Sequence, residues 1–188
     1  MRGLFFVLAV CLVFTSSTVV RADGANRKKA KAAFKEAKKL FEEEKYAEAA
    51  RRFRQANRLN PSWKLLYNIG QSEAAAKHYA KALVAFESYL AKGGDEVTQR
   101  RSEELLSEVQ RLKAMVGVIE IDGKDGDVVK VNGANRGALP KASRVKVSLG
   151  KVRVQVKRDG ELLLNPTSIL VTKKSSKSML FTMVDLRK

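Results

Sequence analysis

The sequence predicts an α+β protein in which N-terminal, all-α helical hairpins with a capping helix are followed by a small antiparallel β-sandwich. The first observation behind this prediction is an internal repeat between residues 30 and 92, where aromatic and small residues recur 33 positions apart. The second is a change after Met115, where apolar residues pass from helical spacing to the two-residue alternation of strands. These patterns place the helical domain at residues 27–115 and the β-domain at residues 116–188.

Residues 1–22 are typical of a secretory signal peptide. Arg2 supplies a basic start, residues 4–14 form an apolar run, and Val20-Arg21-Ala22 offers a cleavage site. The run is too short to cross a bilayer, so cleavage is expected rather than anchoring. The mature chain would begin near Asp23 without a transmembrane segment, and we expect it in the periplasm, or secreted and associated with the cell envelope.

The chain has one cysteine, Cys11, which lies inside this predicted signal. Lipid attachment there is disfavoured, because Val10 is bulky and the apolar run continues beyond the cysteine. The mature chain would contain no cysteine, so it could be exported without forming a disulfide.

Each repeat contains two apolar stripes at helical spacing joined by a polar link. The links are residues 43–45 in the first copy and residues 76–78 in the second, which predicts two helix-turn-helix hairpins. The first helix is expected to open near residues 26–28. The matched positions are Phe34, Tyr46, Ala49 and Phe53 with Tyr67, Tyr79, Ala82 and Phe86.

The small, aromatic and turn positions of both copies together resemble the tetratricopeptide repeat (TPR) family. The residues that carry the resemblance are Ala33, Tyr46, Ala49, Phe53, Ala56 and Pro61, then Tyr67-Asn68-Ile69-Gly70, Tyr79, Ala82, Phe86 and Gly93-Gly94. The sequence departs from the family pattern at Ala37, where glycine is usual, at Glu73, where an aromatic or leucine is usual, and at Tyr89, where alanine is usual.

The resemblance implies that the first helix of each hairpin lines a concave groove for a protein partner. The candidate groove residues are Lys31, Phe34, Lys35, Lys38, Lys64, Tyr67, Asn68, Gln71 and Arg101. Their lysines predict a basic groove suited to an acidic peptide. Only Asn68 and Arg101 match positions by which some family members grip a terminal carboxylate.

Residues 95–116 are predicted to form a further helix. Leu105, Val109 and Leu112 share one apolar face, Gly93-Gly94 ends the preceding helix, and Asp95 can cap the new one. We expect this helix to cover the open end of the second hairpin. A dimerising coiled coil is the alternative, disfavoured because the stripe lasts under three heptads.

Seven short strands are expected after Met115, separated by glycine-containing turns. Their ranges are 116–121, 128–131, 145–149, 152–156, 162–164, 169–171 and 179–184. The clearest pair is a predicted hairpin between the third and fourth strands, closed at Leu149-Gly150-Lys151. Its outward cations form a candidate basic face for an anionic envelope component: Lys146, Lys151, Arg153 and Lys157.

Residues 116 to about 172 resemble a PEGA domain. The matching residues are Val129 to Gly133, Gly137 to Pro140, Leu149-Gly150 with Val152, Val154 and Val156, and Asp159-Gly160. The resemblance implies a bacterial envelope or surface protein, in which this module commonly follows TPR units.

The chain has a formal net charge of +17, and loss of residues 1–22 would leave 35 basic against 20 acidic residues. For an exported protein this balance favours anionic polysaccharide, lipid headgroups or acidic protein as partners. Nucleic acid is disfavoured, because the sequence contains no known reader motif. A charge that serves only solubility is an equally strong interpretation.

The sequence predicts no enzyme, cofactor or metal. His78 is the only histidine, so the common nucleophile–base pairs are missing. Asp122, Asp125 and Asp127 alternate as in a calcium loop, but the required glycine and closing glutamate are absent, which predicts a solvated turn. We therefore expect an exported binding or scaffold protein. The alternative is a structural envelope protein in which the β-domain carries the function and the helices mediate self-association.

Overall fold

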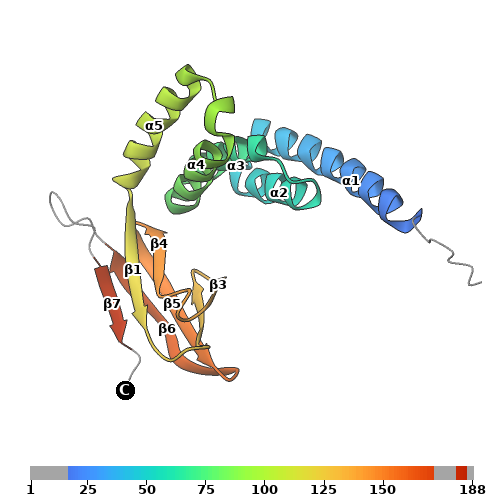
Figure 1. Cartoon of the computed structure of the whole chain (residues 1–188). Helices are drawn as coiled ribbons and strands as arrows, with labels where there is room; N and C mark the ends of the chain where they lie inside the picture. The colour runs from blue at the N-terminus through green and yellow to red at the C-terminus, as the bar shows by residue number, and fades with distance from the viewer. Residues whose placement is uncertain (1–16, 172–180, 186–188) are drawn as a thin grey trace, which may run out of the picture.

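A computed structural model of the chain describes residues 17–171 and 181–185, and confirms the α+β class (Figure 1). Most of the predicted signal peptide and the start of the last predicted strand lie outside the described residues. The helices are α1 (Ser17–Glu42), α2 (Tyr46–Leu59), α3 (Trp63–Ala75), α4 (Tyr79–Gly93) and α5 (Gln99–Lys113). The strands are β1 (Val116–Asp122), β2 (Val128–Val131), β3 (Ala134–Ala138), β4 (Arg144–Ser148), β5 (Gly150–Arg158), β6 (Glu161–Val171) and β7 (Phe181–Asp185).

Helix α1 begins earlier than predicted, at Ser17 rather than near residue 26. No proline interrupts residues 17–26, and Gly24 is the only strong helix-weakening residue among them, which a helix tolerates at a cost of about 1 kcal/mol. The helix therefore runs back into the segment predicted to be removed.

Both hairpins end their first helix with the same backbone motif, as the predicted links require. Glu44 and Lys77, 33 residues apart, both have a φ of 59°. In each link the next residue donates its N–H to a carbonyl five residues back, which ends the helix in a left-handed turn. These bonds join Lys45 to Leu40 (2.9 Å) and His78 to Glu73 (2.8 Å).

The aromatic core positions of the two hairpins are also equivalent. Phe53 is 3% exposed and Phe86 is 2% exposed, as predicted from their shared position in the repeat. The ring of Phe53 packs edge-on against Phe34 at 5.5 Å, and Phe86 packs against Tyr67 at 6.1 Å. Each ring pair packs between the two helices of one hairpin.

Gly70 on α3 lets Phe86 of α4 approach the helix backbone. A Cβ atom at Gly70 would lie 2.4 Å from the Phe86 ring, closer than real contacts allow. We therefore expect Gly70→Ala to destabilise the protein by roughly 1–3 kcal/mol through overpacking, despite its better helix propensity. Urea denaturation followed by circular dichroism measures this change.

The matched control is Ala37, which occupies the corresponding position of the first repeat and is fully buried. Ala37→Gly should cost only about 1 kcal/mol, chiefly through backbone entropy. If Gly70→Ala were as stable as the wild type, the close approach of Phe86 would not be required for folding.

Helix α5 caps the second hairpin, as predicted, but begins later than expected. Gly94 adopts a positive φ of 46° and opens a short 3-10 turn, so the new helix starts at Gln99. Thr98, rather than Asp95, provides the N-cap, its hydroxyl accepting a hydrogen bond from the Arg101 N–H at 3.4 Å. The predicted apolar face is buried in one cluster with Phe86 and Tyr89, so it is not available for a coiled coil.

The described strands form two sheets that pack face to face. The first has the order β4-β1-β7 and the second the order β3-β2-β5-β6. Side chains from both sheets meet in one core that includes Ile119, Val147, Val129 and Val154. This confirms the predicted sandwich, with the exception that β7 pairs with β1 in parallel.

The predicted hairpin between the third and fourth strands is wrong. β4 pairs with β1, whereas β5 pairs with β2 and β6. The chain changes sheets between β4 and β5, at Gly150, whose φ of 112° suits glycine. The alternation of apolar and polar residues along a strand shows which side chains point inward, but it does not determine which other strand pairs with it.

Two other strand assignments also change. The predicted strands 162–164 and 169–171 are parts of one strand, β6. Strand β3 was not expected, because its residues are exposed or half-buried and lack apolar alternation.

Figure 1 shows the helices side by side, with α1 extending away from the sandwich and α5 leading directly into β1. The two domains are also joined by an ion pair between Lys146 and Glu87 (2.9 Å) and by a hydrogen bond from the Ala80 N–H to the Ser148 hydroxyl (3.3 Å). Within the described residues, no helix is both long enough and apolar enough to span a membrane.

Candidate functional site

The first helix of each hairpin, together with α5, lines a helical groove. It consists of two adjoining hollows of ≈310 and ≈260 Å³, which share Phe41 and Gln71. The lining residues are Phe34, Lys38, Phe41, Glu42, Phe53, Tyr67, Asn68, Gln71, Ala74, Phe86, Arg101, Glu104, Leu105 and Glu108. Rings from both repeats therefore give the helical groove an apolar floor.

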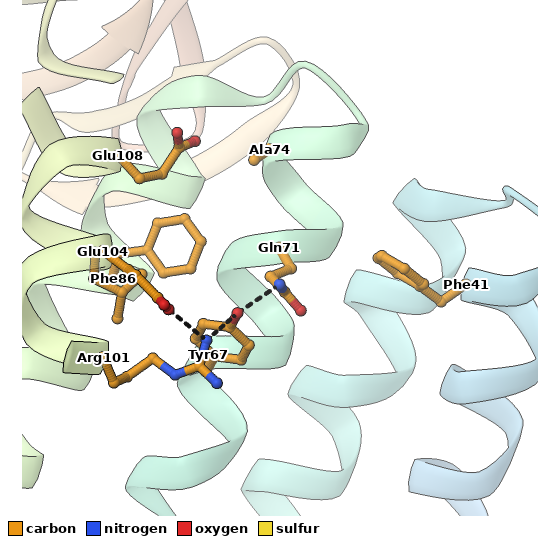
Figure 2. A pocket seen from close by; sticks show the side chains of 9 residues that line it. Phe41, Tyr67, Gln71, Ala74, Phe86, Arg101, Glu104 and Glu108 are labelled. Atoms are coloured by element: carbon orange, nitrogen blue, oxygen red, sulfur yellow. Dashed lines mark hydrogen bonds and ion pairs between the residues drawn. The ribbon is translucent and has the colours of Figure 1, made fainter. Parts of the chain in front are cut away.

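Tyr67 is the centre of a polar cluster in this groove (Figure 2). Its hydroxyl oxygen accepts hydrogen bonds from Arg101 Nη1 at 2.8 Å and from Gln71 Nε2 at 2.7 Å. The Arg101 guanidinium also lies over the Tyr67 ring, 4.7 Å from its centroid. Both lone pairs of the hydroxyl are occupied, so its own hydrogen is available to an acceptor on a ligand.

The helical groove is mixed in charge, which contradicts the prediction of a basic groove. Lys38 and Arg101 are balanced by Glu42, Glu104 and Glu108 among the lining residues. Arg101 also contacts Glu104 at 3.4 Å. Two of the three acids, Glu104 and Glu108, come from α5, which has no counterpart within the two repeats.

Six of the nine predicted groove residues line the helical groove: Phe34, Lys38, Tyr67, Asn68, Gln71 and Arg101. Lys31 and Lys35 are exposed on α1 outside it. Lys64 instead lies over the Trp63 ring, 5.4 Å from its centroid. Helical spacing places Phe41 on the same face as Phe34 and Lys38, although it was not among the predicted groove residues. The other lining residues that were not predicted are Glu42, Phe53, Ala74, Phe86, Glu104, Leu105 and Glu108.

The predicted basic face of the β-domain is not one surface. Lys151, Arg153 and Lys157 alternate with buried valines along β5, so they share the outer face of the four-stranded sheet. Lys146 belongs to β4 in the other sheet and pairs with Glu87 of α4. The error follows from the wrong hairpin, which placed all four cations on neighbouring strands.

Two acidic side chains are buried and paired. Glu73, 1% exposed, contacts Arg54 and lies 2.7 Å from His78 Nδ1, which explains how an acid occupies an interior repeat position. Asp127, also 1% exposed, accepts hydrogen bonds from Arg158 at 2.7 and 2.8 Å.

The predicted solvated turn is therefore wrong for Asp127. Hydrogen bonds from the Arg158 guanidinium hold the pKa of Asp127 below its usual value, although burial acts in the opposite direction. The carboxylate closes the turn structurally, accepting the Lys124 N–H at 3.0 Å. Among the residues that the structure describes, no group of three His, Cys, Asp or Glu side chains could hold a metal ion.

The fold and the groove together define a two-domain chain of stacked helical hairpins and a β-sandwich, with its candidate ligand surface on the first helices of the hairpins. In comparisons with known proteins, no family model matches the chain, and no curated protein or solved structure is significantly similar to it.

Proposed function

We propose that the protein is an exported, non-enzymatic binding or scaffold protein whose helical groove holds a peptide segment of a protein partner. The observation that carries this proposal is the Tyr67–Arg101–Gln71 cluster set into an aromatic floor. An apolar side chain of the peptide fits the hollows, while a peptide carbonyl accepts the free hydrogen of the Tyr67 hydroxyl. The resemblance to TPR proteins supports the same assignment.

The charge of the helical groove refines the class of peptide. Lys38 and Arg101 stand beside three glutamates, so a purely acidic segment would meet repulsion as well as attraction. We therefore favour a segment with an apolar anchor and mixed or no charge. In the same proposal, the Lys151, Arg153 and Lys157 face of the β-domain rests on an anionic component of the cell envelope.

Blocking the helical groove tests the proposal. Gln71 is exposed and borders both hollows, so Gln71→Trp should fill them without disturbing the core. Peptides selected from a random display library on the wild-type protein should bind the variant at least about tenfold more weakly, equivalent to about 1.4 kcal/mol. Isothermal titration calorimetry measures both affinities.

The matched control is Arg51→Trp, which adds the same side chain at an exposed position of α2 outside the helical groove. It should leave the affinity for the selected peptides unchanged. The free energy of unfolding of both variants should lie within about 0.5 kcal/mol of the wild-type value. Selected peptides that bind Gln71→Trp as tightly as the wild type would refute the groove as the binding site.

Export is tested separately. If residues 1–22 act as a signal, N-terminal sequencing of protein recovered from the envelope or periplasmic fraction should begin near Asp23. Replacing the apolar Leu8 and Leu12 by Arg should retain the uncleaved chain in the cytoplasm. Recovery of a membrane-bound form that still begins at Met1 would instead identify the segment as an anchor.

A further inference from the structure

A second cavity, the interdomain cleft, lies between the second helices of the hairpins and the edge strands β3 and β4. Its volume is ≈900 Å³, within the range of ligand sites in proteins. It shares no lining residue with the helical groove. The lining residues are Arg54, Asn57, Arg58, Leu66, Ile69, Ala80, Lys81, Val84, Ala85, Ser88, Ala134, Arg136, Lys141, Ala142, Arg144, Val145 and Lys146.

Seven of these residues are basic and none is acidic. Three of the seven pair with acids outside the lining: Arg54 with Glu73, Arg144 with Glu120 and Lys146 with Glu87. The other four have no ion-pair partner within the described part of the chain: Arg58, Lys81, Arg136 and Lys141. They come from α2, α4, β3 and the loop before β4, so folding gathers cations that are far apart in the sequence.

Arg136 gives the strongest indication of a ligand. Its Nε atom is buried and has no hydrogen-bond partner among the described residues. Buried guanidinium nitrogens are normally hydrogen-bonded, and a carboxylate is the acceptor that matches their fork geometry. Arg136 and Lys81 also line an adjoining hollow of ≈170 Å³, which extends the interdomain cleft toward His78 and Ser148.

The remainder of the lining is largely apolar. Leu66, Ile69 and Val145 contribute to it, and Val84 is 48% exposed there. A ligand that satisfies the whole interdomain cleft must therefore carry apolar groups as well as negative charge.

Two anionic classes fit this lining less well. None of the described residues that line the cavity is aromatic, so nucleic-acid bases would have no stacking platform there. A bilayer surface is broad, whereas these cations line a cavity between two domains. A single extended chain can enter such a cavity.

We propose that the interdomain cleft binds an acidic peptide segment in which carboxylate side chains lie beside small apolar ones. The carboxylates pair with Arg136, Arg58, Lys81 and Lys141, and the apolar side chains cover Val84 and its neighbours. Because the lining comes from both domains, the bound segment holds them in one relative orientation. This site is independent of the peptide proposed for the helical groove.

The probe is a fluorescein-labelled peptide of about eight residues, alternating Glu and Val, titrated into the full-length mature protein. Fluorescence anisotropy should show binding that weakens at least about tenfold as NaCl rises from about 50 to about 300 mM, because the Debye length shortens. The isosteric Gln–Val peptide should bind at least about tenfold more weakly at the lower salt concentration.

Charge reversal locates the site. Arg58→Glu with Lys141→Glu should weaken binding at least about tenfold. Lys28→Glu with Lys113→Glu changes the net charge equally at exposed positions outside the cavity. The affinity of this control variant for the Glu–Val peptide should therefore stay within about twofold of the wild-type affinity. The Gln71→Trp variant should bind the Glu–Val peptide as the wild type does, which separates this site from the helical groove.

Equal losses in the two double variants would overturn the proposal, because the attraction would then be to net charge alone. It would also be overturned if phosphatidylglycerol vesicles or a single-stranded oligonucleotide bound with higher affinity than the peptide and lost that binding in the Arg58→Glu, Lys141→Glu variant. Those results would assign the same cations to a lipid or to a nucleic acid.

Discussion

Phe86→Ala and Phe53→Ala should each lower the free energy of unfolding by roughly 3–5 kcal/mol, because each removes a large, almost fully buried ring. Phe86 lies against Gly70 and in the cluster that joins α4 to α5, so its loss also loosens the capping helix. The array has two hairpins and one cap, so few other contacts can compensate. Either variant is therefore expected to approach unfolding of the helical domain.

Urea denaturation followed by far-ultraviolet circular dichroism measures both losses. Leu106→Ala serves as the control, since Leu106 is 50% exposed on α5 and its truncation should change stability by no more than about 0.5 kcal/mol. Wild-type denaturation midpoints for both phenylalanine variants would contradict the packing described for the two repeats.

Asp127→Ala should lower the free energy of unfolding by about 3 kcal/mol. The carboxylate is buried, accepts two hydrogen bonds from Arg158 and one from the Lys124 N–H, and its removal leaves these donors without their acceptor. This value is at the lower end of the range for breaking a buried ion pair, because the Arg158 side chain is 27% exposed and can turn toward water. Asp125→Ala, at an exposed position of the same turn, is the control and should be nearly neutral.

The same pair predicts a pH dependence. Hydrogen bonds from Arg158 lower the pKa of Asp127 in the folded state, so the stability that it contributes is complete above the unfolded-state value of about 3.9. That contribution is lost as pH falls through the lower, folded pKa. The difference in stability between wild type and Asp127→Asn should therefore shrink below about pH 4. Urea denaturation midpoints of both proteins at about pH 7 and about pH 2.5 test this. If the difference in stability between them were the same at both pH values, the ion pair between Asp127 and Arg158 would not be its source.

Local features of the chain could be predicted from the sequence. The hairpin links at residues 43–45 and 76–78 were predicted at the observed positions, because the turn that ends each helix depends only on neighbouring residues. The equivalent burial of Phe53 and Phe86 followed from the 33-residue spacing. The inward side chains of β5 followed from alternation, since successive residues of a strand point to opposite faces.

Binding surfaces were less predictable than elements. Phe34, Lys38, Tyr67, Asn68 and Gln71 were located through the repeat, and Arg101 through the family resemblance. The acids Glu104 and Glu108 were not located, because α5 has no counterpart within the two repeats. The groove was consequently expected to be basic, whereas the structure balances Lys38 and Arg101 with Glu42, Glu104 and Glu108.

The sequence by itself determined where the helices turn, which side chains face inward and how strongly basic the chain is, since these depend on residue type and short-range spacing. Only the tertiary structure decided that β4 joins β1, that Lys146 faces Glu87, and that Arg58, Lys81, Arg136 and Lys141 meet around one cavity. The physical reason is that strand pairing and domain docking are chosen by the packing of the whole core. Alternating strands present nearly equivalent edges, so their local pattern is compatible with several partners.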